Sequence, residues 1–78
     1  MDSNAQNDQF KQEQKKLGQT IKKLRTEKGF TQESLAGEAQ INVSYLAKIE
    51  NGYINVSLRY LIKISKALQL KVADLFEF

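Results

Sequence analysis

The sequence predicts an all-α fold, a compact bundle of five short helices. Apolar residues recur at the spacing of amphipathic helices through most of the 78 residues. Several of these stretches begin with a residue that can cap a helix, and glycines follow two of their ends. The chain has no proline and no cysteine, so its stability has to come from the packing of helices within one small domain.

The first predicted helix covers residues 17–28 and ends at Gly29. An apolar stripe defines its buried side, formed by Leu17, Ile21 and Leu24. Residues 1–9 are polar and have no cap, so we expect a disordered arm ahead of a domain that spans residues 10–78. Phe10 could extend the stripe by two helical turns, but we favour a mobile apolar residue in the arm.

Residues 31–51 carry the signals of two short helices joined by a tight turn. Thr31 can cap the first helix and Asn42 the second, because their side-chain oxygens can accept hydrogen bonds from backbone N–H groups of the first turn. Gly52 supplies a left-handed stop after the second helix. Each cap also lies inside a hydrophobic staple, formed by Phe30 with Leu35 and by Ile41 with Leu46. The pattern is typical of a helix-turn-helix motif, which offers its second helix to a DNA major groove.

The second helix of this motif has one apolar side and one small, polar side. Leu46 and Ile49 project to the same side at 3.6 residues per turn, and we expect them to point inward. Hydroxyl, lysine and methyl groups on the other side suit contacts with base edges. That side carries Ser44, Ala47, Lys48 and Asn51, with Val43 at its rim. A plain solvated helix surface is the alternative interpretation.

Ser57 can cap a further helix that runs to about residue 68. Its polar side carries Arg59, Lys63 and Lys66. Arg59 lies in the first turn, where the helix dipole also favours a phosphate, whereas we expect the two lysines to be merely solvated. The buried side is expected to carry Leu58, Leu61, Ile64 and Leu68.

The last segment, residues 70–78, is rich in large apolar side chains. Some of them can simply close the core: Leu70, Val72, Leu75 and Phe76. Phe78 has few places to pack inside so small a domain, which favours an exposed patch used for self-association. We therefore expect a dimer interface formed by Leu75, Phe76 and Phe78.

Composition limits the classes of function. The formal net charge is +3, and residues 17–71 hold nine basic and four acidic side chains, which modestly favours a polyanionic partner. Without histidine or cysteine the chain lacks the commonest general base, a thiolate nucleophile and the usual transition-metal ligands. We expect no enzyme activity, no metal site, no cofactor and no small-molecule ligand. No signal peptide or membrane-spanning apolar run is present, so we expect a cytoplasmic protein.

The order and spacing of several short strings between residues 17 and 76 resemble the phage-repressor and Cro-like helix-turn-helix family. These strings are Ile21-Lys22-Lys23-Leu24-Arg25, Lys28-Gly29-Phe30-Thr31-Gln32, Leu35-Ala36, Ile49-Glu50-Asn51-Gly52, Ile64 and Ala67-Leu68. The sequence departs from the family pattern at Gln40, where a glycine is usual in the turn, and at Lys71, where a serine commonly caps the last helix. Gln40 implies either a left-handed residue at some cost or a different turn.

The resemblance implies a lambda-repressor-like domain that binds double-stranded DNA. It implies a largely buried ion pair between Arg25 and Glu50, which ties the first helix to the end of the recognition helix. It places Gln32, Asn51 and Gly52 at phosphates, with Gln32 also bracing the recognition helix. Base-reading and groove-flanking positions fall at Val43, Ser44, Tyr45 and Lys48.

We therefore expect a sequence-specific transcriptional regulator, a repressor or an activator-repressor that also controls its own gene. A homodimer would present two recognition helices about 34 Å apart to a palindromic operator. No second domain for sensing a small molecule is expected in a chain of this length. Restriction-modification controller proteins are a specific subtype that the sequence resembles. The alternative is a protein-interaction module, such as an antitoxin or the target of an antirepressor.

Overall fold

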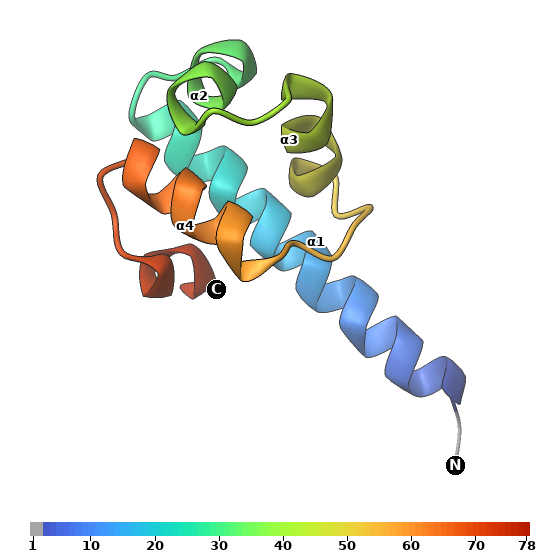
Figure 1. Cartoon of the computed structure of the whole chain (residues 1–78). Coiled ribbons are helices and arrows are strands. Elements are labelled where there is room, and N and C mark those ends of the chain that lie inside the picture. Colours follow the sequence, from blue (N-terminus) through green and yellow to red (C-terminus); the bar gives the residue numbers. More distant parts are fainter. Residues whose placement is uncertain (1–2) are drawn as a thin grey trace.

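The computed structural model describes residues 3–78 and contains helices but no strand within that range (Figure 1). It confirms the all-α prediction, with one difference: four of the five expected helices are α-helices and the last is a 3-10 helix. In chain order the elements are α1 (Ser3–Glu27), α2 (Gln32–Ala39), α3 (Val43–Glu50), α4 (Leu58–Ala67) and η1 (Val72–Phe76).

The C-terminal half of α1 packs against α3 and η1, and α2 completes the bundle by packing against α3 and α4 (Figure 1). Each helix contributes its apolar stripe because that is the surface whose burial stabilises the fold. The side chains at the centre of the core are fully buried: Ile21, Leu35, Leu46, Ile49, Ile64, Leu68 and Leu75.

The N-terminal half of α1 projects well beyond the other helices (Figure 1). The sequence predicts a disordered arm at residues 1–9, whereas the structure has α1 from Ser3 onward; residues 1–2 lie outside the described part of the chain. Phe10 is likewise in a helix and not in a mobile arm, with 65% of its surface exposed. A helix that is already nucleated extends cooperatively through residues without proline or glycine, and residues 3–17 contain neither.

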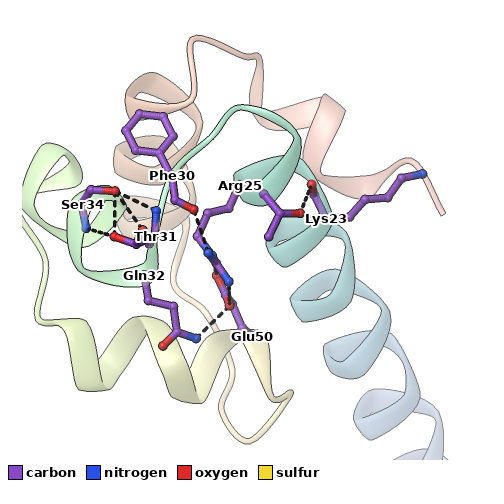
Figure 2. Close-up of polar contacts among 8 residues, drawn as sticks. Lys23, Arg25, Phe30, Thr31, Gln32, Ser34 and Glu50 are labelled. Atoms are coloured by element: carbon purple, nitrogen blue, oxygen red, sulfur yellow. Dashed lines mark hydrogen bonds and ion pairs between the residues drawn. The ribbon is translucent and has the colours of Figure 1, made fainter.

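The three expected N-terminal caps are confirmed. The Thr31 side chain accepts a hydrogen bond from the Ser34 N–H at 3.0 Å, and the Ser34 hydroxyl in turn accepts one from the Thr31 N–H (Figure 2). Asn42 Oδ1 accepts hydrogen bonds from the N–H groups of Ser44 and Tyr45. Ser57 caps α4 in the same way. These caps fix where α2, α3 and α4 begin.

The turn between α2 and α3 keeps the geometry that a glycine would favour, although it holds a glutamine. Gln40 has φ of 57° and ψ of 48°, the left-handed conformation. The Ile41 N–H then donates to the Ala36 carbonyl oxygen at 2.9 Å, which closes the end of α2. Of the two alternatives raised by the sequence, the tolerated left-handed residue is the correct one.

Two glycines allow α1 to approach the end of α3 closely. A Cβ atom at Gly18 would lie 2.3 Å from the Ile49 carbonyl oxygen and 2.7 Å from that of Glu50. Gly52, with φ of 73°, confirms the left-handed stop after α3, and a Cβ there would lie 2.8 Å from the Lys15 Cα atom. The absence of a side chain at these two positions therefore sets the distance between α1 and the C-terminal end of α3.

The structure differs from two expectations for α4, the burial of Leu58 and the full solvation of Lys63. Leu58, expected on the buried side, is the first residue of α4 and is 64% exposed, because the core-facing stripe begins one turn later at Leu61. Lys63, expected to be solvated, places its Nζ 3.5 Å from the Gln40 carbonyl oxygen and 5.6 Å from the centre of the Tyr60 ring. This lysine joins α4 to the turn that precedes α3.

The start of η1 is fixed without a serine at position 71. The Asp74 carboxylate accepts a hydrogen bond from the Lys71 N–H at 2.9 Å, which is the interaction of the third helical residue in a capping box. The departure at Lys71 is therefore compensated from within the helix.

Candidate nucleic-acid interface

The side of α3 that faces away from the core carries small and polar side chains. Leu46 and Ile49 are fully buried as predicted, and their burial fixes the rotation of α3 about its own axis. Ser44, Lys48 and Asn51 are exposed on the other side, and Val43 is exposed at its rim. The arrangement presents hydroxyl, ammonium, amide and methyl groups at the molecular surface, on a helix whose orientation is set by its own core residues.

Tyr45 lies between this surface and α4. Its ring is half-buried and contacts the Tyr60 ring, with ring centres 4.5 Å apart and planes tilted by 40°. Such aromatic contacts contribute about 0.5 to 1.5 kcal/mol beyond the area that they bury. The pair braces α3 against α4. Tyr45 therefore occupies a more enclosed position than the exposed Ser44 and Lys48.

Arg25 and Glu50 form the buried ion pair that the resemblance implied (Figure 2). Arg25 Nε donates to Glu50 Oε2 at 2.7 Å and Arg25 Nη2 donates to Glu50 Oε1 at 3.1 Å, so the contact is bidentate. Arg25 Nη1 donates to the Phe30 carbonyl oxygen at 2.8 Å. The two residues are only 7% and 5% exposed. One guanidinium thus joins α1, the loop before α2, and the last residue of α3.

Gln32, at the first position of α2, also contacts Glu50. Its Nε2 donates to Glu50 Oε1 at 2.9 Å, and Figure 2 shows the amide extending from α2 toward α3. This contact is the bracing role that the resemblance implied. The amide group has a second N–H and its oxygen beyond this hydrogen bond, and the side chain remains partly exposed.

The residues after α3 differ in what they offer to a ligand. The Gly52 N–H donates to the Ile49 carbonyl oxygen at 3.0 Å, and the Asn51 N–H donates to the Ala47 carbonyl oxygen at 3.0 Å. Both backbone donors are therefore used within the helix end. The Asn51 side chain is exposed, and so is Arg59 in the first turn of α4. The role of Gly52 in this region is to allow the close approach of α1 at Lys15.

The C-terminal apolar patch is smaller than the sequence suggested. Leu75 is fully buried, so its expected place in a dimer interface is wrong; the 3-10 turn of η1 points it into the core. Phe76 and Phe78 are 46% and 52% exposed, and their ring centres lie 6.3 Å apart. Phe10 of α1 lines the same shallow groove as these two rings.

Sequence reasoning missed the residues that act only through tertiary contacts. The sequence alone assigns no role to Gly18 or to Tyr60, because each acts through a contact with a distant part of the chain. A glycine inside an amphipathic helix is nevertheless a usable sign that another backbone approaches closely.

Among the described residues, no helix combines the length and the apolar composition needed to cross a membrane.

Comparisons with known proteins agree with this geometry. The chain is 44% identical over 62 residues to the control protein C.MunI of a Mycoplasma species, covering 78% of this chain and 84% of that one. It is 37% identical to the transcriptional regulator SlrR of Bacillus subtilis, but it spans only 41% of SlrR's length. The crystal structure of the restriction-modification controller protein C.AhdI from Aeromonas hydrophila matches with a TM-score of 0.79 and 40% identity, covering 81% of this chain and 96% of C.AhdI.

A family model described as helix-turn-helix matches residues 21–75, which contain α2, α3, α4 and part of α1. This match covers more than half of the chain and includes the capped pair α2 and α3 together with the Arg25–Glu50 pair. The chain belongs to the helix-turn-helix family of the transcriptional regulators and controller proteins that it resembles.

Proposed function

We propose that this protein is a sequence-specific, double-stranded DNA-binding transcriptional regulator that acts as a homodimer. The observation that carries the proposal is the fixed presentation of α3, with Leu46 and Ile49 buried and Ser44 and Lys48 exposed. An α-helix fits the major groove of B-DNA, where each base pair presents a distinct pattern of donors, acceptors and methyl groups.

In this proposal the exposed residues of α3 read the bases. The Ser44 hydroxyl can donate or accept a hydrogen bond, Lys48 can donate to guanine oxygen or nitrogen, and a Val43 methyl can contact the thymine methyl group. Tyr45, held by Tyr60, would flank the groove instead of entering it deeply. Because α3 is held at its start by the Asn42 cap and at its end by Glu50, DNA binding would not have to order the helix backbone, and only the exposed side chains would lose conformational freedom.

Phosphate contacts would fix the register of α3 in the groove. Gln32 lies at the start of α2, Asn51 at the end of α3 and Arg59 at the start of α4, so the three flank α3 along the chain. Gln32 could donate its second amide N–H to a phosphate while still bound to Glu50. Gly52 would contribute by shaping the backbone.

The exposed rings of Phe76 and Phe78 and the small size of one reading helix both support a dimer. A single helix of this kind supplies limited affinity, and a two-fold dimer doubles the contacts on a palindromic operator. Burying the two rings would also remove apolar surface from water. Similarity to a control protein and to a restriction-modification controller protein supports a regulatory role. In this proposal the protein acts in the cytoplasm and controls nearby genes, including its own.

The test is binding to duplex DNA as a function of salt. The wild-type protein should bind a DNA duplex that carries its own promoter region, and affinity should fall steeply as salt rises because counterions are released. Ser44→Glu should abolish specific binding while circular dichroism stays unchanged, since an acidic residue in the first turn suits a helix N-terminus. Gln19→Glu, which adds the same charge on an exposed part of α1, is the control. Absence of salt-dependent DNA binding, with a protein partner captured instead, would favour an interaction module.

A further inference from the structure

A groove lined by polar and basic residues lies between the projecting half of α1 and the segment that follows α3. Its volume is about 440 Å³, and its walls come from two places that are far apart in the sequence. Figure 1 shows the chain after α3 passing beside α1 before α4 begins. The groove is lined by Lys11, Gln12, Gln14, Lys15, Asn51, Gly52 and Tyr53.

The chemistry of the groove fits an anion. Lys11 and Lys15 are one helical turn apart and both are exposed, so their ammonium groups can reach the same ligand. The Asn51 amide and the Tyr53 hydroxyl, on a ring that is 75% exposed, can add hydrogen-bond donors. Among the described residues that line the groove, none is acidic. Two cations with neutral hydrogen-bond donors beside them match the negative charge and the acceptor oxygens of a phosphodiester.

The position of the groove ties it to the surface of α3. Asn51 belongs both to this groove and to the exposed side of α3. The close approaches at Gly18 and Gly52 place α1 directly beside the end of α3, so Lys11 and Lys15 start from a backbone that lies next to that surface. At 1.5 Å per residue, the 25 residues of α1 extend about 37 Å. Lys11 and Lys15 precede residue 21, where the family match begins, so they belong to a part of α1 outside that match.

We propose that this groove binds the phosphodiester backbone of the same duplex that α3 reads, beyond the phosphate at Asn51. The proposal rests on the proposed DNA-binding function. In this arrangement Lys11 and Lys15 lengthen the footprint of each protomer without contacting bases. They would add affinity for any sequence and would leave the choice of sequence to α3.

The test compares Lys11→Gln/Lys15→Gln with Lys16→Gln/Lys23→Gln on a mixed-sequence duplex of about 30 base pairs, a length that exceeds typical half-site pairs. Both variants remove two positive charges from α1, and glutamine and lysine have similar helix propensities. Lys16 and Lys23 line a different groove on α1. Affinity is measured by fluorescence anisotropy at several salt concentrations, and helix content by circular dichroism.

The slope of log K against log salt should become shallower in Lys11→Gln/Lys15→Gln, by about 0.9 for each phosphate that the variant no longer neutralises. The control variant should keep a slope closer to that of the wild type. Equal slopes for both variants, or an unchanged slope in Lys11→Gln/Lys15→Gln, would overturn the groove proposal while leaving DNA binding by α3 intact. If the wild-type protein itself shows no salt-dependent binding, the failure lies with the proposed function instead.

Discussion

Arg25 of α1 and Glu50 of α3 face each other through two hydrogen bonds of 2.7 and 3.1 Å in a site where both are almost fully buried. Glu50 is the last residue of α3 and Arg25 is close to the last residue of α1, so the pair joins two helix ends. Gln32 adds α2 to the same carboxylate. The orientation of α3 therefore depends on one polar cluster as well as on its apolar side.

Removing one partner of the Arg25–Glu50 pair should strongly destabilise the protein. Glu50→Ala should lower the free energy of unfolding by about 3 to 5 kcal/mol, because a buried guanidinium is left without its counter-charge. Urea denaturation followed by circular dichroism measures this change. Arg25→Met/Glu50→Met should be less destabilised than the single variant, since no charge remains buried. A decrease below about 1 kcal/mol in Glu50→Ala would show that the pair contributes little.

Replacing Gly18 of α1 and Gly37 of α2 by alanine should change the stability of the protein in opposite directions. Gly18→Ala should destabilise the protein by about 1 to 3 kcal/mol, because its Cβ would lie 2.3 Å from a backbone oxygen of α3. Gly37→Ala has nothing within 4 Å of the new Cβ and should stabilise α2 by about 0.5 to 1 kcal/mol. Thermal unfolding of the two variants side by side makes the comparison. Equal shifts would contradict the close approach of α1 and α3.

Replacing the left-handed Gln40 in the turn should be able to raise the stability of the protein. Gln40→Gly relieves the steric cost of φ at 57° and should raise the free energy of unfolding by up to about 1 kcal/mol. The gain is limited, since glycine also loses more backbone entropy on folding. Gln40→Val, with a β-branched side chain in the same conformation, should be destabilised. The midpoint of urea unfolding distinguishes the two, and a destabilised Gln40→Gly would be inconsistent with this turn geometry.

Self-association should depend on the exposed rings. Phe76→Ser/Phe78→Ser should weaken the dimer, measured as a rise of at least about tenfold in the dimer dissociation constant, because each protomer then has two fewer apolar side chains to bury. Sedimentation equilibrium gives the constant. Val43→Ser removes exposed apolar surface from α3 and serves as the control. An unchanged constant in the double variant would place the interface elsewhere.

The parts of the fold that could be predicted from the sequence are those set by local chemistry. Thr31, Asn42 and Ser57 act on the backbone within three residues, so the starts of α2, α3 and α4 follow from the sequence. The burial of Leu46 and Ile49 follows from their spacing. The Arg25–Glu50 pair and the bracing Gln32 are implied by the family resemblance, and the structure confirms both contacts.

The remaining features depend on neighbours that are distant in the sequence. The environments of Leu58 and Leu75 differ from those predicted because the spacing of apolar residues does not show where the core begins or ends. The Tyr45–Tyr60 contact requires the relative placement of α3 and α4. The early start of α1 was not predicted because the residues ahead of Leu17 lack an apolar stripe, although they also lack a proline or glycine that would end a helix.

The most direct test of the central claim is selection of binding sites from a pool of randomised duplexes. The wild-type protein should enrich a two-fold symmetric sequence, Ser44→Ala and Lys48→Ala should each change the preferred base at defined positions, and Arg59→Ala should lower affinity without changing the preference. Bidentate or comparable base contacts are worth about 1 to 3 kcal/mol of discrimination, which is well within the range of this measurement. An identical preferred sequence in all four proteins, or no enrichment by the wild type, would contradict the assignment of α3 as the reading helix.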